Sequence, residues 1–191
     1  MCGIIGVSGV SDAPEVIVEA LRRLEYRGYD SAGMAIYQGG SFKRVREATG
    51  THSVELLAKH VKDFQGSESV SGLGHNRWAT HGKPSQGNAH PQFDCSGRVA
   101  VVHNGIVENF AELKDELLDQ GHVFTSDTDT EVIAHLLEVA LGGTDRIDDA
   151  LAEVFPKLRG AMAIVTMETS RPTLLACVRR TMDSAMDSAI L

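Results

Sequence analysis

The chain has 191 residues, 42% hydrophobic and 23% charged, which is an ordinary composition for one folded domain with a full core. Its formal net charge is −8 and its largest basic groups are Arg44-Val45-Arg46 and Arg179-Arg180, which argues against nucleic acid or an anionic membrane as the main partner. No apolar run approaches the roughly 20 residues that span a bilayer, and the apolar N-terminus lacks the basic segment of a signal peptide. We therefore expect a cytoplasmic protein whose partners are small molecules.

The first half of the chain alternates between strand and helix patterns. Gly3 to Val10 is a short apolar run typical of a buried strand, and Asp12-Ala13-Pro14-Glu15 predicts a helix start with an N-cap, an early proline and a capping-box acid. We then expect a hairpin of two strands at 31–37 and 42–46, followed by a short helix at 53–64. A third strand at 70–73 and an aperiodic loop at 77–91 complete this half.

The second half continues with a buried strand, an amphipathic helix, a short strand, two helices and two strands. The strands are expected at 99–103, 122–125, 160–167 and 173–178. The helices are expected at 109–120, after the capping box Thr128-Asp129-Thr130-Glu131, and at 147–158. Because strands come in groups with helices between them, an α+β sandwich of sheets fits better than a doubly wound parallel sheet. Residues 182–185 and 186–189 repeat Met-Asp-Ser-Ala and carry no clear strand or helix pattern.

The three cysteines suit a reducing compartment, since Cys2, Cys95 and Cys177 are too far apart to suggest a disulfide framework or a metal pair. Cys95 and Cys177 are interpreted as structural or incidental. Four histidines lie at spacings of 6, 9 and 13 residues, which match no common zinc signature. These are His75, His81, His90 and His103. We expect neither a metal nor an organic cofactor.

Cys2 stands directly behind the initiator methionine, so removal of Met1 would leave a thiol and a free α-amine on one residue. A thiol attacks as thiolate and titrates at about 8.5, while an α-amine titrates at roughly 7.7–8.0 and is a suitable base. Cys2 can therefore supply both nucleophile and base. The alternative is that a cysteine near an N-terminus has no special role.

Two loops carry polar residues that a plain core does not require. In the segment 75–82, Arg77 is a candidate for holding a carboxylate in a bidentate pair, and the alternative makes it a surface cation with Trp78 as a core anchor. Asn104-Gly105 is a strong hairpin signal, yet the residues that follow lead into a helix. The Asn104 side chain and the Gly105 N–H are therefore candidate donors to an oxyanion. Asp129 suits a helix N-terminus and also a substrate ammonium.

Six motifs follow one another in the order found in a known family. They are Cys2 to Gly6, Arg22 to Gly33, Arg77 to Gly82, Asn88-Ala89-His90-Pro91, Val102 to Asn109 and Ser126 to Glu131. Over roughly residues 2–178 the chain resembles the class II glutamine amidotransferases of the N-terminal-nucleophile type, and among them the glutaminase domains of glucosamine-6-phosphate synthases. Tyr26 to Ser31 and Trp78-Ala79-Thr80 favour the synthases over the amidophosphoribosyltransferases. The fold implied is a four-layer αββα sandwich with Cys2 at the end of its first strand.

The resemblance also implies a role for each matching residue. Cys2 would attack the side-chain amide of L-glutamine, with Asn104 and Gly105 holding the oxyanion, and water would hydrolyse the resulting thioester. Arg77 would bind the α-carboxylate of glutamine and Asp129 its α-ammonium. The other implied site residues are Trp78, Thr80 and His81 in a loop that closes over the substrate, Arg27 bracing the nucleophile, and His90 in a supporting position.

Two departures from the family pattern stand out. Asn76 occupies a position where the family usually has threonine, a change interpreted as surface-compatible. After residue 178 the chain matches neither the remaining glutaminase strands nor the sugar-phosphate isomerase region that binds fructose 6-phosphate. The expected organisation is a type 2 glutamine amidotransferase domain at 1–178, incomplete at its C-terminus, and an atypical tail at 179–191.

The function expected is hydrolysis of L-glutamine to glutamate and ammonia. In the full-length enzyme this would be the ammonia-supplying half of glutamine–fructose-6-phosphate transamination to glucosamine 6-phosphate. Two alternatives stay open: an amidotransferase for another acceptor, of the amidophosphoribosyltransferase kind, and a catalytically inactive fragment.

Overall fold

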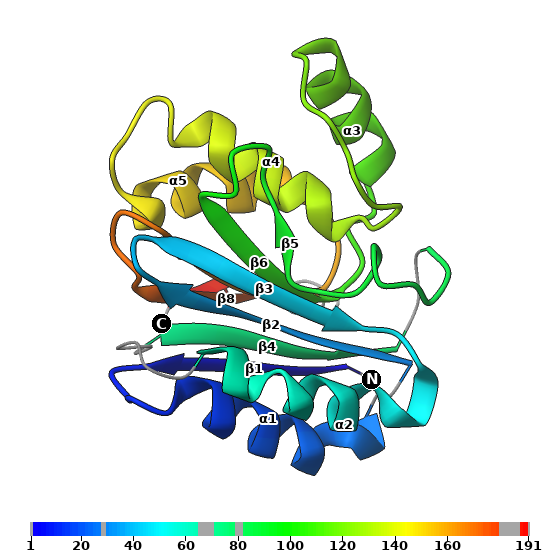
Figure 1. Cartoon of the computed structure of the whole chain (residues 1–191). Coiled ribbons are helices and arrows are strands. Elements are labelled where there is room, and N and C mark those ends of the chain that lie inside the picture. Colours follow the sequence, from blue (N-terminus) through cyan, green and yellow to red (C-terminus); the bar gives the residue numbers. More distant parts are fainter. Residues whose placement is uncertain (1, 28–29, 65–70, 79–81, 180–187, 191) are drawn as a thin grey trace.

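Two antiparallel sheets stack face to face between two layers of helices (Figure 1). The computed structural model describes residues 2–27, 30–64, 71–78, 82–179 and 188–190. The first sheet has the order β1 (Gly3–Ser8), β4 (Ser71–Arg77), β2 (Ser31–Gln38), β3 (Ser41–Glu47). The second has the order β5 (Gln92–Phe93), β6 (Val99–Gly105), β7 (Met162–Glu168), β8 (Leu174–Arg179), β9 (Ser188–Ile190).

The helices form the two outer layers. The first sheet is covered by α1 (Ala13–Leu24) and α2 (Ser53–Lys59), and the second by α4 (Thr130–Ala140) and α5 (Ile147–Val154), while α3 (Phe110–Asp119) projects beyond this layer (Figure 1). Short 3₁₀ helices occupy Glu25–Arg27, Gly50–His52, Val61–Phe64 and Phe155–Lys157. The predicted αββα sandwich is confirmed. None of the described helices is long and apolar enough to cross a membrane.

Three apolar cores hold the four layers together, as a sandwich of this kind requires. The core between the two sheets contains Ala35, Leu73, Ala100, Val102 and Met167. The core under α1 and α2 includes the fully buried Ile17 and Leu21, which lie about one turn apart on a single face of α1. The core under α4 and α5 joins these helices to α3 and the outer face of the second sheet.

Several local predictions are wrong, and the structure gives the physical reason. Residues 122–125 form no strand, because their backbone donors bond outside any sheet: the His122 N–H donates to the Leu117 carbonyl oxygen, the Val123 N–H to Cys95 Sγ and the Thr125 N–H to Glu131 Oε1. Neither predicted capping box forms. Asp12 makes no side-chain cap hydrogen bond, and α4 begins at Thr130, so that Asp129 and not Thr128 stands at its N-cap position, also without a side-chain cap hydrogen bond. The strand β5, only two residues long, was not predicted.

The segment around residue 179 also differs from the expectation. Strand β9 pairs with β8 in antiparallel register, although no clear strand pattern was recognised there. Arg179, placed by the sequence in an atypical tail, is buried at the end of β8. Its guanidinium donates to the backbone carbonyls of Phe155 and Leu158 and lies 4.3 Å from the centre of the Phe155 ring. This arginine therefore fastens β8 to the segment that follows α5.

Candidate active site

Strand pairing brings Cys2 next to Arg77 and Trp78. The register of β1 with β4 places Gly3 opposite Asn76, so the residue before β1 meets the residues that end β4. The Trp78 N–H donates to Cys2 Sγ over 3.1 Å, and the thiol lies 3.6 Å from the Trp78 carbonyl oxygen. Burial raises the pKa of the Cys2 thiol, and the Trp78 backbone hydrogen bond and the Arg77 charge oppose this rise. A thiol in this setting needs a base.

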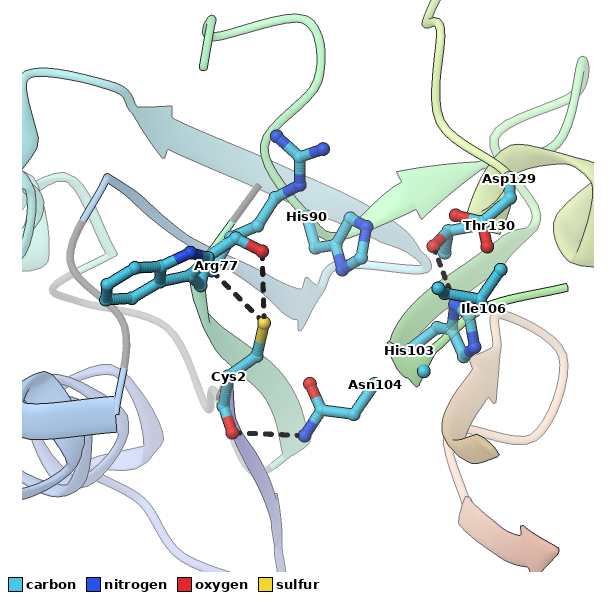
Figure 2. Close-up of a pocket in the computed structure, with 10 residues that line it drawn as sticks. Cys2, Arg77, His90, His103, Asn104, Ile106, Asp129 and Thr130 are labelled. Carbon is cyan, nitrogen blue, oxygen red and sulfur yellow. Dashed lines mark hydrogen bonds between the residues drawn. The ribbon is translucent and has the colours of Figure 1, made fainter. Parts of the chain in front are cut away.

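Cys2 opens onto a pocket of about 360 Å³ formed by the ends of β4 and β6 and the start of α4. Most of the predicted site residues line it, together with three that the sequence did not single out for this site. The lining consists of Cys2, Arg77, Trp78, His90, His103, Asn104, Gly105, Ile106, Asp129 and Thr130 (Figure 2). A pocket of this size accommodates a small polar molecule with the thiol in its wall.

The Asn104 side chain is held in one orientation beside Cys2. Its Nδ2 donates to the Cys2 carbonyl oxygen over 3.2 Å, and its Oδ1 lies 2.9 Å from His75 Nε2 (Figure 2 draws the Cys2 contact). Because an amide oxygen only accepts, His75 donates from Nε2. Burial lowers the pKa of His75 to about 3, so the ring is neutral and its tautomer is set by this bond. The amide N–H₂ of Asn104 therefore faces Cys2, as an oxyanion donor must.

Gly105 could not be replaced by a larger residue without strain. Its φ is +119°, and a Cβ built there would lie 2.2 Å from the Ala161 carbonyl oxygen. The strand β6 runs through Asn104 and Gly105 opposite β7 and then leads toward α3, so no hairpin forms at this Asn-Gly pair. The prediction that excluded a simple hairpin is confirmed.

Arg77 and Asp129 bring opposite charges to the pocket. Arg77 is only 4% exposed, which excludes the surface-cation alternative, and its Nη2 donates to the Gly82 carbonyl oxygen over 3.4 Å. Burial lowers the pKa of Arg77, and the nearby carboxylates, among them Asp129, oppose this. Asp129 is also buried and accepts the Val107 N–H on Oδ2 over 2.8 Å. A cation and an anion in one small pocket suit a zwitterionic ligand.

The His90 loop is fixed from both sides. His90 is buried, its ring centre lies 4.4 Å from that of His75, and burial holds its pKa well below the usual range. Arg46 Nη1 donates to the carbonyl oxygens of Gly87 and Ala89, which anchors the segment before His90. A Cβ on Gly33 of β2 would lie 2.1 Å from the His90 carbonyl oxygen, so only glycine lets this loop pack so closely.

Three pocket residues were missed by the sequence reasoning. His103 Nδ1 lies 3.0 Å from Thr130 Oγ1, which joins the end of β6 to the start of α4, and burial lowers the pKa of His103 against the opposing charge of Asp129. Ile106 adds an apolar wall. All three lie inside the motifs Val102 to Asn109 and Ser126 to Glu131, but the motifs do not show that these side chains face the pocket, because the pocket forms only once two distant elements meet.

Trp78 and Asn76 differ in burial from what the sequence suggests. Trp78 is 49% exposed, so it is no core anchor. Thr80, His81 and the side chain of Arg27 lie outside the described residues. Asn76 is fully buried and donates from Nδ2 to the Leu21 carbonyl oxygen over 2.6 Å, so the prediction of a surface-compatible change is wrong. The amide instead ties β4 to α1, one residue from Arg77.

The combination of an αββα sandwich and a cysteine ahead of the first strand defines the N-terminal-nucleophile class of amidotransferase folds. A family described as glutamine amidotransferase domain matches residues 75–182. The chain belongs to this family.

Curated relatives share the sequence over most of this chain. The glutamine–fructose-6-phosphate aminotransferase (isomerizing) of Thermococcus kodakarensis is 52% identical over 94% of this chain and 29% of its own length. The enzyme of the same name from Acinetobacter baylyi is 49% identical over 94% of this chain and 28% of its own length. The chain thus spans less than a third of these relatives.

A solved structure shares the fold at lower identity. Glutamine phosphoribosylpyrophosphate amidotransferase from B. subtilis, complexed with ADP and GMP, superposes with a TM-score of 0.73 and 25% identity, over 98% of this chain and 41% of that one. The identities favour the aminotransferases over this structural relative, as the sequence motifs predicted.

Proposed function

We propose that this chain hydrolyses L-glutamine to glutamate and ammonia through a thioester on Cys2. The observation that carries the proposal is the convergence of a thiol, an oriented amide donor and two opposite charges on one pocket. Membership in the glutamine amidotransferase domain family supports the choice of glutamine.

The chemistry proceeds in two halves. The Cys2 thiol attacks the side-chain amide carbon of glutamine, and its proton passes to the α-amine that Cys2 carries once Met1 is removed. The amide oxygen becomes an oxyanion, which the Asn104 Nδ2–H and the Gly105 N–H stabilise. The C–N bond then breaks, the α-amine returns the proton to the leaving group, and ammonia departs. Water attacks the thioester, and glutamate and the free thiol result.

Arg77 and Asp129 supply the selectivity in this proposal. The Arg77 guanidinium pairs with the α-carboxylate of glutamine and the Asp129 carboxylate with its α-ammonium. Both charged side chains are buried in the pocket wall. A substrate without one of these groups would leave a charge of the protein without its partner, so discrimination against simple amides should be strong.

We further propose that the chain acts as the ammonia-supplying part of a glutamine–fructose-6-phosphate aminotransferase. Its curated relatives carry that name, and a sugar-phosphate isomerase domain would supply the fructose 6-phosphate site. The domain boundaries proposed from the sequence, 1–178 and 179–191, belong to this proposal. We place the enzyme in the cytoplasm, since Cys2 must stay reduced and all three cysteines are free thiols.

The proposal is tested by measuring glutamate and ammonia released from L-glutamine and from two analogues, one without the α-amine and one without the α-carboxylate. We expect one glutamate and one ammonia per glutamine and a large loss of kcat/KM with either analogue. An uncleavable tag on the N-terminus should abolish turnover, while the same tag on the C-terminus should not. Full activity with the blocked N-terminus would exclude the α-amine as the base.

Two variants separate binding from chemistry. Arg77→Ala and Asp129→Asn remove the partners of the substrate charges, so each should raise KM for L-glutamine far more than it lowers kcat. Against the analogue that lacks the α-amine, Asp129→Asn should lose little compared with the parent. Equal losses on both substrates would contradict the assignment of Asp129 to the ammonium.

A further inference from the structure

We propose that Cys95, His122, His135 and Glu138 form a binding site for one Zn²⁺ ion, separate from the pocket at Cys2. One ligand atom from each residue lies within 4.8 Å of all the others. The sequence favours a structural or incidental role for Cys95, because the cysteines lie too far apart to suggest a metal pair. Its partners stand 27, 40 and 43 positions further along the chain.

Four of the six distances between the ligand atoms are close to the edges of a tetrahedron around zinc. With Zn–S near 2.3 Å and Zn–N and Zn–O near 2.0–2.1 Å, the sulfur–nitrogen edges of a tetrahedron are about 3.5 Å and the nitrogen–oxygen edges about 3.3 Å. Cys95 Sγ lies 3.7 Å from His122 Nδ1 and 3.6 Å from His135 Nδ1. Glu138 Oε2 lies 3.1 Å and 3.3 Å from the same two nitrogens. All four measured edges agree with the expected ones within about 0.2 Å.

The ligand set also balances the charge of the ion. A thiolate, a carboxylate and two neutral imidazoles together carry a charge of about −2, which Zn²⁺ neutralises. Thiolate and imidazole select a borderline-soft metal over calcium or magnesium, which prefer oxygen ligands. The chemistry of the donors therefore points to zinc.

The surroundings of the four ligands resemble an outer shell that orients them. The Val123 N–H donates to Cys95 Sγ over 3.4 Å, the kind of contact that stabilises a thiolate. His135 is 1% exposed, and its second ring nitrogen, Nε2, faces Glu131 Oε1 at 3.8 Å, a contact longer than a hydrogen bond. A carboxylate commonly stands behind a metal-bound histidine, and a small shift of the ring would let Glu131 accept the Nε2–H in this way.

An ion at this position would tie three segments together. Cys95 lies between β5 and β6, His122 follows α3, and His135 and Glu138 lie one turn apart on α4. Behind them, Glu131 accepts the N–H groups of Thr125 and Ser126, at the start of the loop that ends in Asp129. The site would therefore be structural and would stabilise the connection that carries Asp129.

The first experiment measures metal content and affinity. The untagged chain is prepared with Cys2→Ala, so that the nucleophile cannot bind zinc, purified without chelators, and analysed by mass spectrometry of its metals. We expect about one zinc per chain, and tight binding when apoprotein competes with a chromophoric chelator for Zn²⁺. Absence of zinc together with no competition would overturn the proposal.

Variants place the ion. Cys95→Ser and His122→Ala should each weaken zinc binding by at least about 100-fold, because loss of an outer-shell partner alone costs 10–100-fold. His52→Ala, at an exposed histidine, and Cys177→Ala, at the other cysteine, serve as matched controls and should bind zinc like the parent. Unchanged binding by Cys95→Ser would overturn the proposal.

Cobalt gives a readout that needs no substitution of the four proposed ligands. Co²⁺ replacing zinc should give the intense visible bands of a tetrahedral ion and a thiolate-to-cobalt charge-transfer band in the Cys2→Ala chain. Removal of the metal by a chelator should lower Tm by about 5–10 °C, as expected when a ligand at 100 times its Kd is lost from a chain of this size. Weak octahedral bands without charge transfer, or an unchanged Tm, would contradict the site.

Discussion

The environments of Cys2 and Cys95 show how neighbours decide what a thiol can do. Cys2 Sγ contacts the backbone N–H and carbonyl of Trp78, near the Arg77 cation and an open pocket. Cys95 Sγ also accepts a backbone N–H, from Val123, but it lies 3.7 Å and 3.6 Å from two imidazole nitrogens, beside a carboxylate that both rings contact. A nearby cation and space for a substrate suit a nucleophile, whereas two ring nitrogens and a carboxylate around the sulfur suit a metal ion bound by all four groups.

The histidines of the two regions differ in the same way. His75 contacts an amide oxygen and another histidine, and its pKa is lowered to about 3 by burial, so it acts as a neutral donor. His122 and His135 instead face the Glu138 carboxylate and a thiol. Residue type alone therefore does not tell a nucleophilic cysteine from a metal-binding one, or a hydrogen-bonding histidine from a metal-binding one. Their neighbours do.

The largest contrast is expected between the two cysteines. Cys2→Ala removes the nucleophile and should lower glutamine turnover by about 10⁴–10⁶-fold, the range seen when a catalytic nucleophile is deleted. Cys95→Ser should keep kcat within a few-fold of the parent, because Cys95 does not line the pocket. Glutamate release measures both, and circular dichroism checks folding. If Cys2→Ala and Cys95→Ser both folded and lost kcat to a similar extent, the two cysteines would not differ in role as proposed.

Asn104→Ala tests the pocket side of the comparison without touching the thiol. Loss of one oxyanion donor should lower kcat by about 10²–10³-fold with little change in KM. Steady-state kinetics on L-glutamine separate the two constants, and Asn109→Ala, at a half-buried asparagine that bonds to the backbone of Lys157 and Arg159, is the matched control. An Asn104→Ala enzyme with the kcat of the parent would exclude the oxyanion role.

The layers, most strands and the principal pocket residues could be predicted from the sequence. Strand and helix periods are local, and the motifs around Cys2, Arg77 and Asn104 are contiguous in the chain. Contacts between distant positions could not be predicted in this way. The bond from His75 to Asn104 spans 29 positions and depends on the stacking of two sheets.

Burial was the other weak point of the sequence reasoning. Asn76 was placed at the surface because a polar residue is usually exposed, yet the approach of α1 to β4 covers it and the Leu21 carbonyl satisfies its amide. Cys95 was set aside because metal signatures are recognised by short spacings, and its partners come from three separate segments. Both errors arise where tertiary contacts override a local pattern.

A smaller effect is expected at His75, which we propose as a positioning residue for Asn104. His75→Leu removes the donor to Asn104 Oδ1 and lets the amide rotate, so kcat should fall by up to about 100-fold, the cost of a misplaced group. His75→Gln restores a donor and should recover part of the loss. In an Asn104→Ala background, His75→Leu should have little additional effect on kcat. If the kcat losses of His75→Leu and Asn104→Ala were additive, or if His75→Gln recovered no activity, His75 would have only a packing role.

The pH dependence of stability is the finest test, since it compares protonation in the folded and unfolded chain. The pKa of His75 is lowered from 6.5 to about 3 by burial, so the unfolded state binds the proton more readily. Above pH 6.5 the ring is neutral in both states, and protonation does not lower the free energy of unfolding. As the pH falls from 6.5 toward 3, the unfolded chain takes up a proton that the folded chain does not, and the free energy of unfolding falls by up to about 1.4 kcal/mol per pH unit for this one group.

Glu131 loses its contribution to stability in a lower pH window, because the neighbouring His135 and the hydrogen bonds from Ser126 and Thr125 outweigh burial and lower its pKa from 4.5 to about 2. Between pH 6.5 and 4.5 the buried histidines of the pocket should therefore dominate the loss. Urea unfolding at pH 6.5, 5.5 and 4.5, with a chelator present to keep metal out of the Cys95 region, measures the slope. His75→Gln removes one titrating group and should reduce that slope by up to about 1.4 kcal/mol per pH unit. An unchanged slope in the folded variant would mean that His75 is not held neutral in the native pocket.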